Sequence, residues 1–198
     1  MLDQDSFREM EAYLKEEDSR REEMINTSRV ILKNSKSAIY SLHRHELDKA
    51  KSLLDESKQL IERLTKITDK HPHLKQHIEN ALEEYCEACC FYGFINDKNI
   101  PTYKDLGLEP FTYLGGLSDL TGELGRRSVL EAIARNREEV KAIRELVDEI
   151  YGAFARLDLR NGDLRNIVIT WDRNALASFL SQLALPFVET VYAEVPHV

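Results

Sequence analysis

The first 71 residues contain neither glycine nor proline, and all eight glycines and all five prolines follow them. Glycine and proline are the residues that most often end or kink a helix, so nothing in this part of the chain has to interrupt one. From residue 47, small or apolar residues recur three or four positions apart and so form a stripe on one face of a helix: Leu47, Ala50, Leu54, Ser57, Ile61 and Leu64. We therefore expect a helix over about 5–42 and a second from residue 47, packed antiparallel.

The rest of the chain predicts further helices that are separated by glycine and proline. A third helix starts at Pro72 and runs to about Asn96, and residues 97–109 supply the only long connection. Pro110 suits the first turn of a fourth helix over about 111–134. A fifth helix over 137–157, a turn at 160–163 and a mostly apolar last helix over 176–193 complete the chain. Because β-alternation of useful length is absent, we predict an all-α fold of six or seven helices.

Composition excludes several classes of protein. With 198 residues, 42% hydrophobic and 31% charged, the chain suits a single globular domain over residues 1–198. The longest uncharged stretch, 174–188, is shorter than the roughly 20 apolar residues that cross a bilayer. The N-terminus lacks the pattern of a secretory signal, so we expect a cytoplasmic protein without a membrane partner. A net charge of -8 excludes a generic nucleic-acid binder, and any nucleic-acid site must be local.

Two pairs of acidic residues are each spaced about one helical turn apart. Glu84 and Glu87 share a helix face with apolar residues, and Asp119 and Glu123 stand among three glycines. Carboxylates on an apolar face are costly to desolvate without a cation. Four oxygen donors between two helices suit Mg²⁺, which takes a few carboxylates together with substrate phosphate. The alternative is that the acids are solvated, or that Glu123 pairs with Arg126 or Arg127.

A basic face is predicted on the first helix, because residues 24–45 contain no carboxylate. At about 100° per residue, one sector about 80° wide holds Arg29, Lys33, Lys36, Tyr40 and Arg44. Cations at this pitch can follow a phosphate backbone, and Tyr40 can stack on a base. The alternative is a solvated polar face. We add four histidines as candidates for the same surface, with His77 expected on the Glu84 side of its helix: His43, His71, His73 and His77.

Two further patterns resemble metal motifs but favour other interpretations. Cys86, Cys89 and Cys90 have no second pair at zinc spacing, and a helical cysteine is most often a small core residue. Their odd number and close spacing fit a reducing compartment. Ferritin-like di-iron proteins need Glu-x-x-His on two core helices, and Pro196 interrupts the one such spacing at the end of the chain.

At these motifs the chain resembles the translin family, and within it the catalytic, factor X type of subunit. The resemblance rests on residues 28–44, 82–91 and 113–124, and the segment Asp119-Leu-Thr-Gly-Glu123 is distinctive. A weaker similarity lies at residues 151–154. The likeness runs in order over nearly the whole chain. It implies a seven-helix bundle that assembles into a hollow octameric shell with RNA inside.

The resemblance also implies an endoribonuclease that depends on Mg²⁺, with Mn²⁺ as a substitute, and that leaves 5′-phosphate and 3′-hydroxyl ends. By motif position, Glu84, Glu87 and Asp119 are implied as metal ligands and Glu123 as a supporting acid. The chain lacks the basic N-terminal extension of the eukaryotic factor and has a shorter connection after the third helix, which favours a homo-oligomer. The alternatives are a non-catalytic RNA- or DNA-binding oligomer and a purely structural helical assembly.

Overall fold

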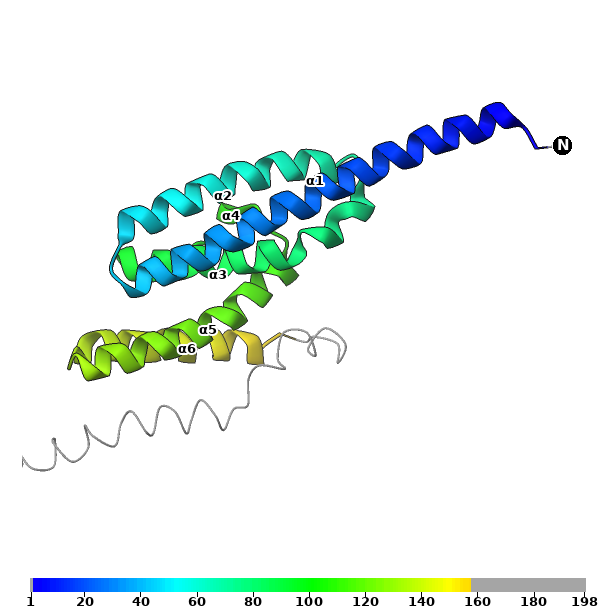
Figure 1. The fold of residues 1–198 in the computed structure, drawn as a ribbon. Helices are drawn as coiled ribbons and strands as arrows, with labels where there is room; N and C mark the ends of the chain where they lie inside the picture. The colour runs from blue at the N-terminus through cyan, green and yellow to red at the C-terminus, as the bar shows by residue number, and fades with distance from the viewer. Residues whose placement is uncertain (1, 158–198) are drawn as a thin grey trace, which may run out of the picture. The chain divides into compact units, whose positions relative to one another are not determined.

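The computed structural model describes residues 2–157. Within this part the chain forms six α-helices, one 3-10 helix and no strand, which confirms the predicted all-α class (Figure 1). The elements are α1 Gln4–His43, α2 Leu47–Thr68, η1 Pro72–His77, α3 Glu79–Asp97, α4 Tyr103–Leu106, α5 Pro110–Ile133 and α6 Arg137–Ala155. Over the same residues, no helix combines the length and the apolarity that crossing a bilayer requires.

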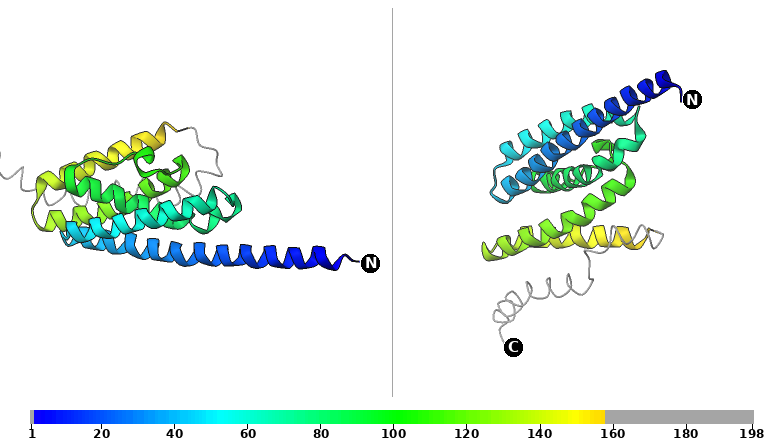
Figure 2. Two further views of the ribbon diagram at one scale, coloured as in Figure 1. Left: turned by 90° about the horizontal axis from the view of Figure 1, so that it is seen from above. Right: turned by 45° about the vertical axis from the view of Figure 1, so that its right-hand side comes forward.

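The chain divides into two compact units, Met1–Gly116 and Leu117–Val198. In the first unit α1, α2 and α3 pack side by side, and α1 and α2 run antiparallel as predicted (Figures 1 and 2). A tight turn after His43 joins these two helices. The first of the six residues in the predicted stripe, Leu47, is half-buried, and the other five form the buried face of α2: Ala50, Leu54, Ser57, Ile61 and Leu64. The spacing of these residues therefore predicted both the helix and the side that packs.

The N-terminal half of α1 extends beyond the other helices of the first unit (Figures 1 and 2). Met24 is the first buried residue of α1, and four large apolar side chains before it are exposed: Phe7, Met10, Tyr13 and Leu14. Ion pairs between residues one helical turn apart lie along this half of α1, among them Arg8–Asp5 at 3.1 Å and Lys15–Glu11 at 2.8 Å. Such pairs each stabilise a helix by a few tenths of a kcal/mol, so they support a segment that little packing holds.

The third helix begins later than the sequence predicts. Pro72 opens the 3-10 helix η1, and the α-helix α3 starts only at Glu79. The fixed φ of proline suits the first turn of either kind of helix, so Pro72 could not distinguish them. Leu74 and Ile78 bury their side chains and anchor this segment to the first unit.

The connection between α3 and α5 contains the single helical turn α4. Thr102 and Asp105 form a capping box, in which the amide of Thr102 donates to Oδ2 of Asp105 at 2.8 Å. The hydroxyl of Tyr113, on α5, donates to the carbonyl oxygen of Pro101 at 2.8 Å. The predicted long connection is therefore confirmed, and hydrogen bonds hold it against the start of α5.

Glycine allows the first turns of α5 to approach α3 closely. A Cβ placed on Gly116 would lie 2.5 Å from the Cβ of Cys86 and 2.8 Å from the carbonyl oxygen of Glu83. Real Cβ atoms do not approach other atoms so closely, because van der Waals repulsion prevents it. Gly122 lies later in the same helix, and a Cβ there would meet no described atom within 4 Å. Two of the four glycines of α5 therefore differ: Gly116 leaves no room for a side chain, whereas Gly122 leaves open space.

In the second unit, α6 runs back alongside the later part of α5 (Figures 1 and 2). Asn136 caps α6 by accepting a hydrogen bond from the amide of Glu139 at 3.3 Å. One stripe of α6 is buried, at Ile143, Val147 and Ile150. The predicted fourth and fifth helices are confirmed. The predicted turn at 160–163 and the last helix over 176–193 lie outside the described residues.

Gly116→Ala should destabilise the protein, because the added methyl group would overlap α3. Overpacking of this kind costs about 1–3 kcal/mol, which urea unfolding would measure as a lower midpoint. Gly122→Ala makes the same chemical change in the same helix, where space is open, and should stabilise by up to about 1 kcal/mol because alanine favours helix. Equal effects of the two substitutions would contradict the close approach of α5 and α3.

Candidate functional site

The helix α3 carries the first acidic pair inside the first unit. Glu87 is only 7% exposed, and its neighbours on α3, Ala88 and Phe91, are fully buried. Glu84 lies one turn earlier, and its side chain is 19% exposed. A carboxylate in such surroundings needs hydrogen-bond donors or a cation to offset its lost hydration. The surroundings of this pair are therefore those expected from the apolar residues that flank it in the sequence.

An ion pair connects Glu84 to the basic face of α1. The Nζ of Lys36 lies 3.6 Å from Oε2 of Glu84, and the lysine side chain is 61% exposed. A pair that is open to solvent contributes only about 0–1 kcal/mol to stability. Its importance is positional, because it places a cation expected to bind RNA within reach of an acid expected to bind a metal.

The second acidic pair lies on α5, in the second unit. Oε2 of Glu123 is 3.7 Å from Nη1 of Arg126, which is one of the two pairings that the sequence allows as an alternative to a metal. Arg127, the other candidate, binds Glu131 at 2.6 Å, and both of these side chains are buried. The structure thus contains a partner for Glu123 that requires no metal ion.

Asp119 differs from Glu123 in its electrostatic surroundings. It lies on the exposed side of α5, yet partial desolvation raises the pKa of its carboxyl above the ordinary value for aspartate. Desolvation disfavours the ionised form, whereas a nearby cation favours it.

Glu84 and Glu87 belong to the first unit, and Asp119 and Glu123 belong to the second. A site that combines both pairs stays a prediction.

The basic face predicted on α1 is an exposed face of that helix. All five residues of the predicted sector are exposed: Arg29, Lys33, Lys36, Tyr40 and Arg44. The guanidinium carbon of Arg44 lies 5.7 Å from the centre of the Tyr40 ring. Nε of Arg44 also lies 2.7 Å from Oε1 of Glu46, so this end of the face is partly neutralised.

Two of the predicted RNA-binding histidines lie elsewhere. His43 packs against α3, with its ring centre 5.0 Å from that of Phe91. His77 was expected on the Glu84 side of one continuous helix, but it ends η1, before α3 begins. A 3-10 helix turns about 120° per residue and an α-helix about 100°, so residues before and after Ile78 do not share faces at α-helical spacing. His77 instead lines a shallow groove with Leu14 and His73.

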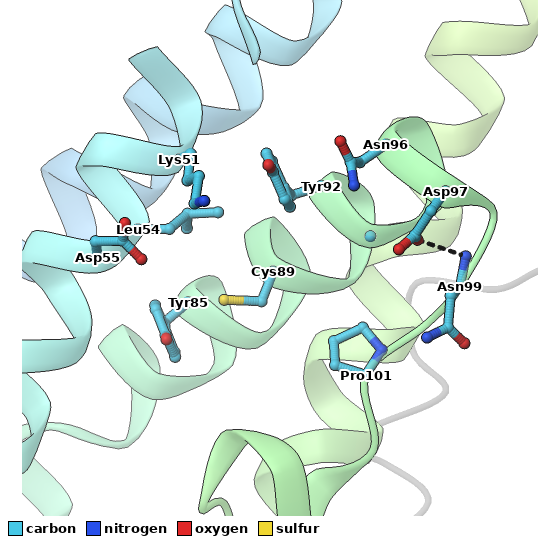
Figure 3. Close-up of a pocket in the computed structure, with 11 residues that line it drawn as sticks. Lys51, Leu54, Asp55, Tyr85, Cys89, Tyr92, Asn96, Asp97, Asn99 and Pro101 are labelled. Carbon is cyan, nitrogen blue, oxygen red and sulfur yellow. Dashed lines mark hydrogen bonds between the residues drawn. The ribbon is translucent and has the colours of Figure 1, made fainter. Parts of the chain in front are cut away.

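The three cysteines are buried and free, as predicted for small core residues. Sγ of Cys86 donates to the carbonyl oxygen of Tyr113 at 3.7 Å. Cys89 lines a groove between α2 and α3, where burial raises the pKa of its thiol to about 12 (Figure 3). A raised pKa disfavours the thiolate that metal binding and redox chemistry need. On α3 this groove lies along Tyr85, Cys89 and Tyr92, a different face from Glu84.

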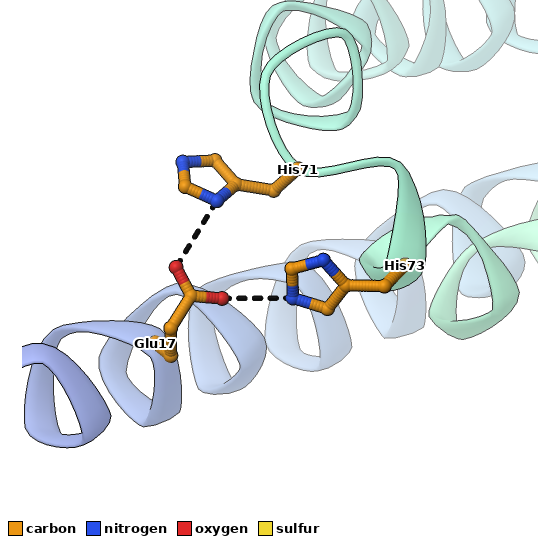
Figure 4. Close-up of side chains that lie close together, drawn as sticks. All are labelled: Glu17, His71 and His73. Atoms are coloured by element: carbon orange, nitrogen blue, oxygen red, sulfur yellow. Dashed lines mark hydrogen bonds and ion pairs between the residues drawn. The ribbon is translucent and has the colours of Figure 1, made fainter.

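One cluster of side chains was not predicted from the sequence. His71 and His73 were candidates for the basic surface, but both contact Glu17 of α1 (Figure 4). The distances are 3.0 Å from Nδ1 of His71 to Oε1 and 2.8 Å from Nε2 of His73 to Oε2. The His-x-His spacing was a signal for such a cluster. Its carboxylate partner lies 56 residues before His73, so no local pattern indicated it.

The raised pKa of Asp119 predicts a pH-dependent penalty. Between its ordinary and its raised pKa, the folded state binds more protons than the unfolded state, so stability falls as pH rises. Asp119→Asn removes the ionisable group. The free energy of unfolding of this variant, measured in urea with EDTA, should therefore exceed that of the wild type by more at about pH 7 than at about pH 4. A gain that is the same at both pH values would contradict the shift, and Asp148→Asn on the exposed face of α6 is the control.

The sequence pattern of the Translin family matches residues 19–170 of this chain. An uncharacterized protein of Methanocaldococcus jannaschii, MJ0175, is 28% identical over 184 residues, which cover 87% of this chain and 82% of the relative. The fold is similar to that in the crystal structure of apo-NeC3PO, with a TM-score of 0.81 and 26% identity over 92% of this chain and 95% of that chain.

The structure of a complex of AfC3PO with duplex RNA is similar in fold, with a TM-score of 0.77 and 20% identity over 97% of this chain and 100% of that chain. The Translin match covers well over half of the chain, and it includes the three segments at 28–44, 82–91 and 113–124. All described elements are helical, as in the sequence-based expectation. The chain therefore belongs to the translin family.

Proposed function

We propose that this protein is a metal-dependent endoribonuclease that hydrolyses RNA phosphodiester bonds. In this proposal Glu84, Glu87 and Asp119 bind the metal ion, Glu123 supports them, and the basic face of α1 holds the RNA. The observation that carries the proposal is the 3.6 Å contact between Nζ of Lys36 and Oε2 of Glu84. It relates the nucleic-acid face and the acidic pair within the first unit.

The Lys36–Glu84 contact has a direct chemical consequence for a bound phosphate. Arg29 and Lys33 precede Lys36 on the same exposed face, so a phosphate backbone that follows these cations would come close to Glu84. A phosphate and a carboxylate repel each other unless a cation lies between them. A divalent cation bound by Glu84 would remove this repulsion and would leave Lys36 to neutralise the phosphate.

The donors of the proposed metal site fit Mg²⁺, and Mn²⁺ in its place. All are carboxylates, the hard oxygen ligands that these ions prefer. The low exposure of Glu87 and the raised pKa of Asp119 indicate carboxylates that water stabilises poorly, which favours the binding of a cation. When bound, the ion would polarise the phosphodiester and lower the pKa of a bound water. The expected products carry 5′-phosphate and 3′-hydroxyl ends, by analogy with the family.

RNA as the partner is supported by the solved structures of similar fold. AfC3PO was solved in complex with duplex RNA, and the likeness covers 97% of this chain. Following the family resemblance, we propose that copies of this chain assemble into a hollow oligomer, an octamer, around the RNA. The exposed apolar residues on the projecting half of α1 offer surface for self-association. A basic lumen within an acidic exterior would reconcile RNA binding with the net charge of -8.

A second candidate function is a translin-like oligomer that binds RNA or DNA without cleaving it. Two ion pairs favour it, because Lys36 and Arg126 compensate Glu84 and Glu123 without any metal ion. In this case the acids would serve structure, and the basic face of α1 would bind nucleic acid by itself. The same assay of cleavage and binding separates the two functions.

Glu87→Gln should abolish cleavage while RNA binding persists, because the amide keeps the shape of the side chain but loses the charge that holds a metal. With an end-labelled RNA and Mg²⁺, we expect the cleavage rate to fall at least about 100-fold, and EDTA to have the same effect on the wild type. Glu79→Gln, in the exposed first turn of the same helix, is the matched control. Undiminished cleavage by Glu87→Gln would remove this residue from the site, and a wild type that binds RNA without cleaving it would favour the second function.

Lys36→Glu should weaken RNA binding most strongly at low salt, because it removes a cation from the basic face of α1. We expect the slope of log affinity against log salt to fall by about 1, as for the loss of one phosphate contact. Lys66→Glu makes the same charge change in the last turn of α2, away from this face, and serves as the control. If filter binding gives equal affinities for both variants, the basic face does not bind RNA.

A further inference from the structure

We propose that Glu17, His71 and His73 form a Zn²⁺ site, separate from the proposed active site, that fastens α1 to the segment after α2. Among the described residues these three form a group whose metal-binding atoms all lie within 4.8 Å of one another. Glu17 belongs to α1, His71 precedes η1, and His73 is part of it (Figure 4). All three lie in the first unit.

The donor atoms of this cluster already face one another. Oε1 of Glu17 is 3.0 Å from Nδ1 of His71, and Oε2 is 2.8 Å from Nε2 of His73. Zinc with ligands at about 2.0–2.2 Å in a tetrahedron keeps those ligands about 3.4 Å apart, so small side-chain rotations suffice. Glu17 and His71 are 13% and 22% exposed, whereas His73 is 59% exposed. The ion would therefore enter beside His73, where a water molecule would complete its coordination.

The composition of the cluster selects the kind of metal. Two imidazole nitrogens and one carboxylate are ligands typical of Zn²⁺, and three protein ligands with one open position are a known zinc arrangement. Mg²⁺ and Ca²⁺ prefer sites made of oxygen alone. The cluster therefore differs in metal preference from the carboxylate set proposed for the active site.

The charge state of Glu17 suits metal binding. Partial desolvation raises the pKa of this carboxyl, but His73, His71 and Arg20 together hold it below the ordinary value for glutamate. The carboxylate is thus ionised at neutral pH. Each imidazole would need to turn a lone pair toward the ion, which neutral histidine does by moving its proton to the other ring nitrogen.

Arg20 is the cation that competes with a metal ion. Its Nη1 donates to Oε1 of Glu17 at 2.6 Å, while its Nη2 binds Glu16. When Glu17 turns toward an ion, Arg20 therefore keeps a carboxylate partner. The groove beside the cluster adds charged or titratable groups of both signs: Asp18, Arg21 and His77.

A metal at this position would brace the projecting half of α1. Glu17 precedes Met24, the first buried residue of the helix, so the cluster lies where α1 leaves the packed core. His71 and His73 flank Pro72, whose fixed φ limits the freedom of their backbone. A bound ion would join the projecting half of α1, which little packing holds, to a segment that the buried side chains of Leu74 and Ile78 anchor.

Zinc titration of the full chain by calorimetry, at neutral pH, tests this proposal. We expect one zinc ion per chain. His73→Gln and His71→Gln should each bind zinc at least about tenfold more weakly, because even the loss of a residue that only hydrogen-bonds to a metal ligand lowers metal affinity by about that factor. Zinc should raise the Tm of the wild type but not that of these variants. His45→Asn, at the exposed turn after α1, is the matched control and should bind zinc like the wild type. Circular dichroism shows whether each variant is folded, and Glu17→Gln serves if one is not.

The absorption spectrum of the Co²⁺-substituted protein identifies the ligands independently. We expect visible bands without a thiolate charge-transfer band, because the site contains no cysteine, and an excess of Mg²⁺ should not displace Co²⁺. Absence of zinc binding would overturn the proposal, as would equal affinity in the wild type and the histidine variants. A thiolate band would also overturn it, because the metal would then lie at the buried cysteines.

Discussion

The burial of α3 is the constraint on which the proposed site depends. This helix packs with α1 and α2, and its small residues allow neighbouring backbones to come close, as Cys86 does at Gly116 of α5. Glu87 lies within this buried surface, where an ionised carboxylate cannot rely on water. Because the packing fixes the helix, it also fixes the position of the carboxylate, which is what a metal ligand requires.

The helix α1 relates three features of the first unit that are distant in the sequence. Near its end, His43 packs on Phe91 and so holds α1 against α3. One to two turns earlier, Lys36 reaches Glu84 from the exposed basic face. Far toward the N-terminus, Glu17 contacts the two histidines that follow α2. A single helix thus carries the proposed RNA face and one ligand of the proposed zinc site.

The helices were largely predictable because their apolar residues recur at helical spacing and because the first 71 residues contain neither glycine nor proline. The 3-10 form of η1 was not predictable, because Pro72 is compatible with both kinds of helix. For Glu123, the partners three and four residues away were equally consistent with the sequence, and Arg127 is buried with Glu131 for reasons of tertiary packing. The cluster at Glu17 depends on a contact across 56 residues, which no periodic pattern indicates.

The family and the acidic motifs were readable from the sequence because each acid pair has helical spacing and lies in a distinctive segment. The proposal that these acids act together is tested most directly by anomalous diffraction from crystals grown with Mn²⁺. The account predicts a manganese peak in contact with Glu84, Glu87 and Asp119, and Nζ of Lys36 displaced from Glu84. A structure with no manganese at these carboxylates, and with the Lys36–Glu84 pair intact, would contradict it.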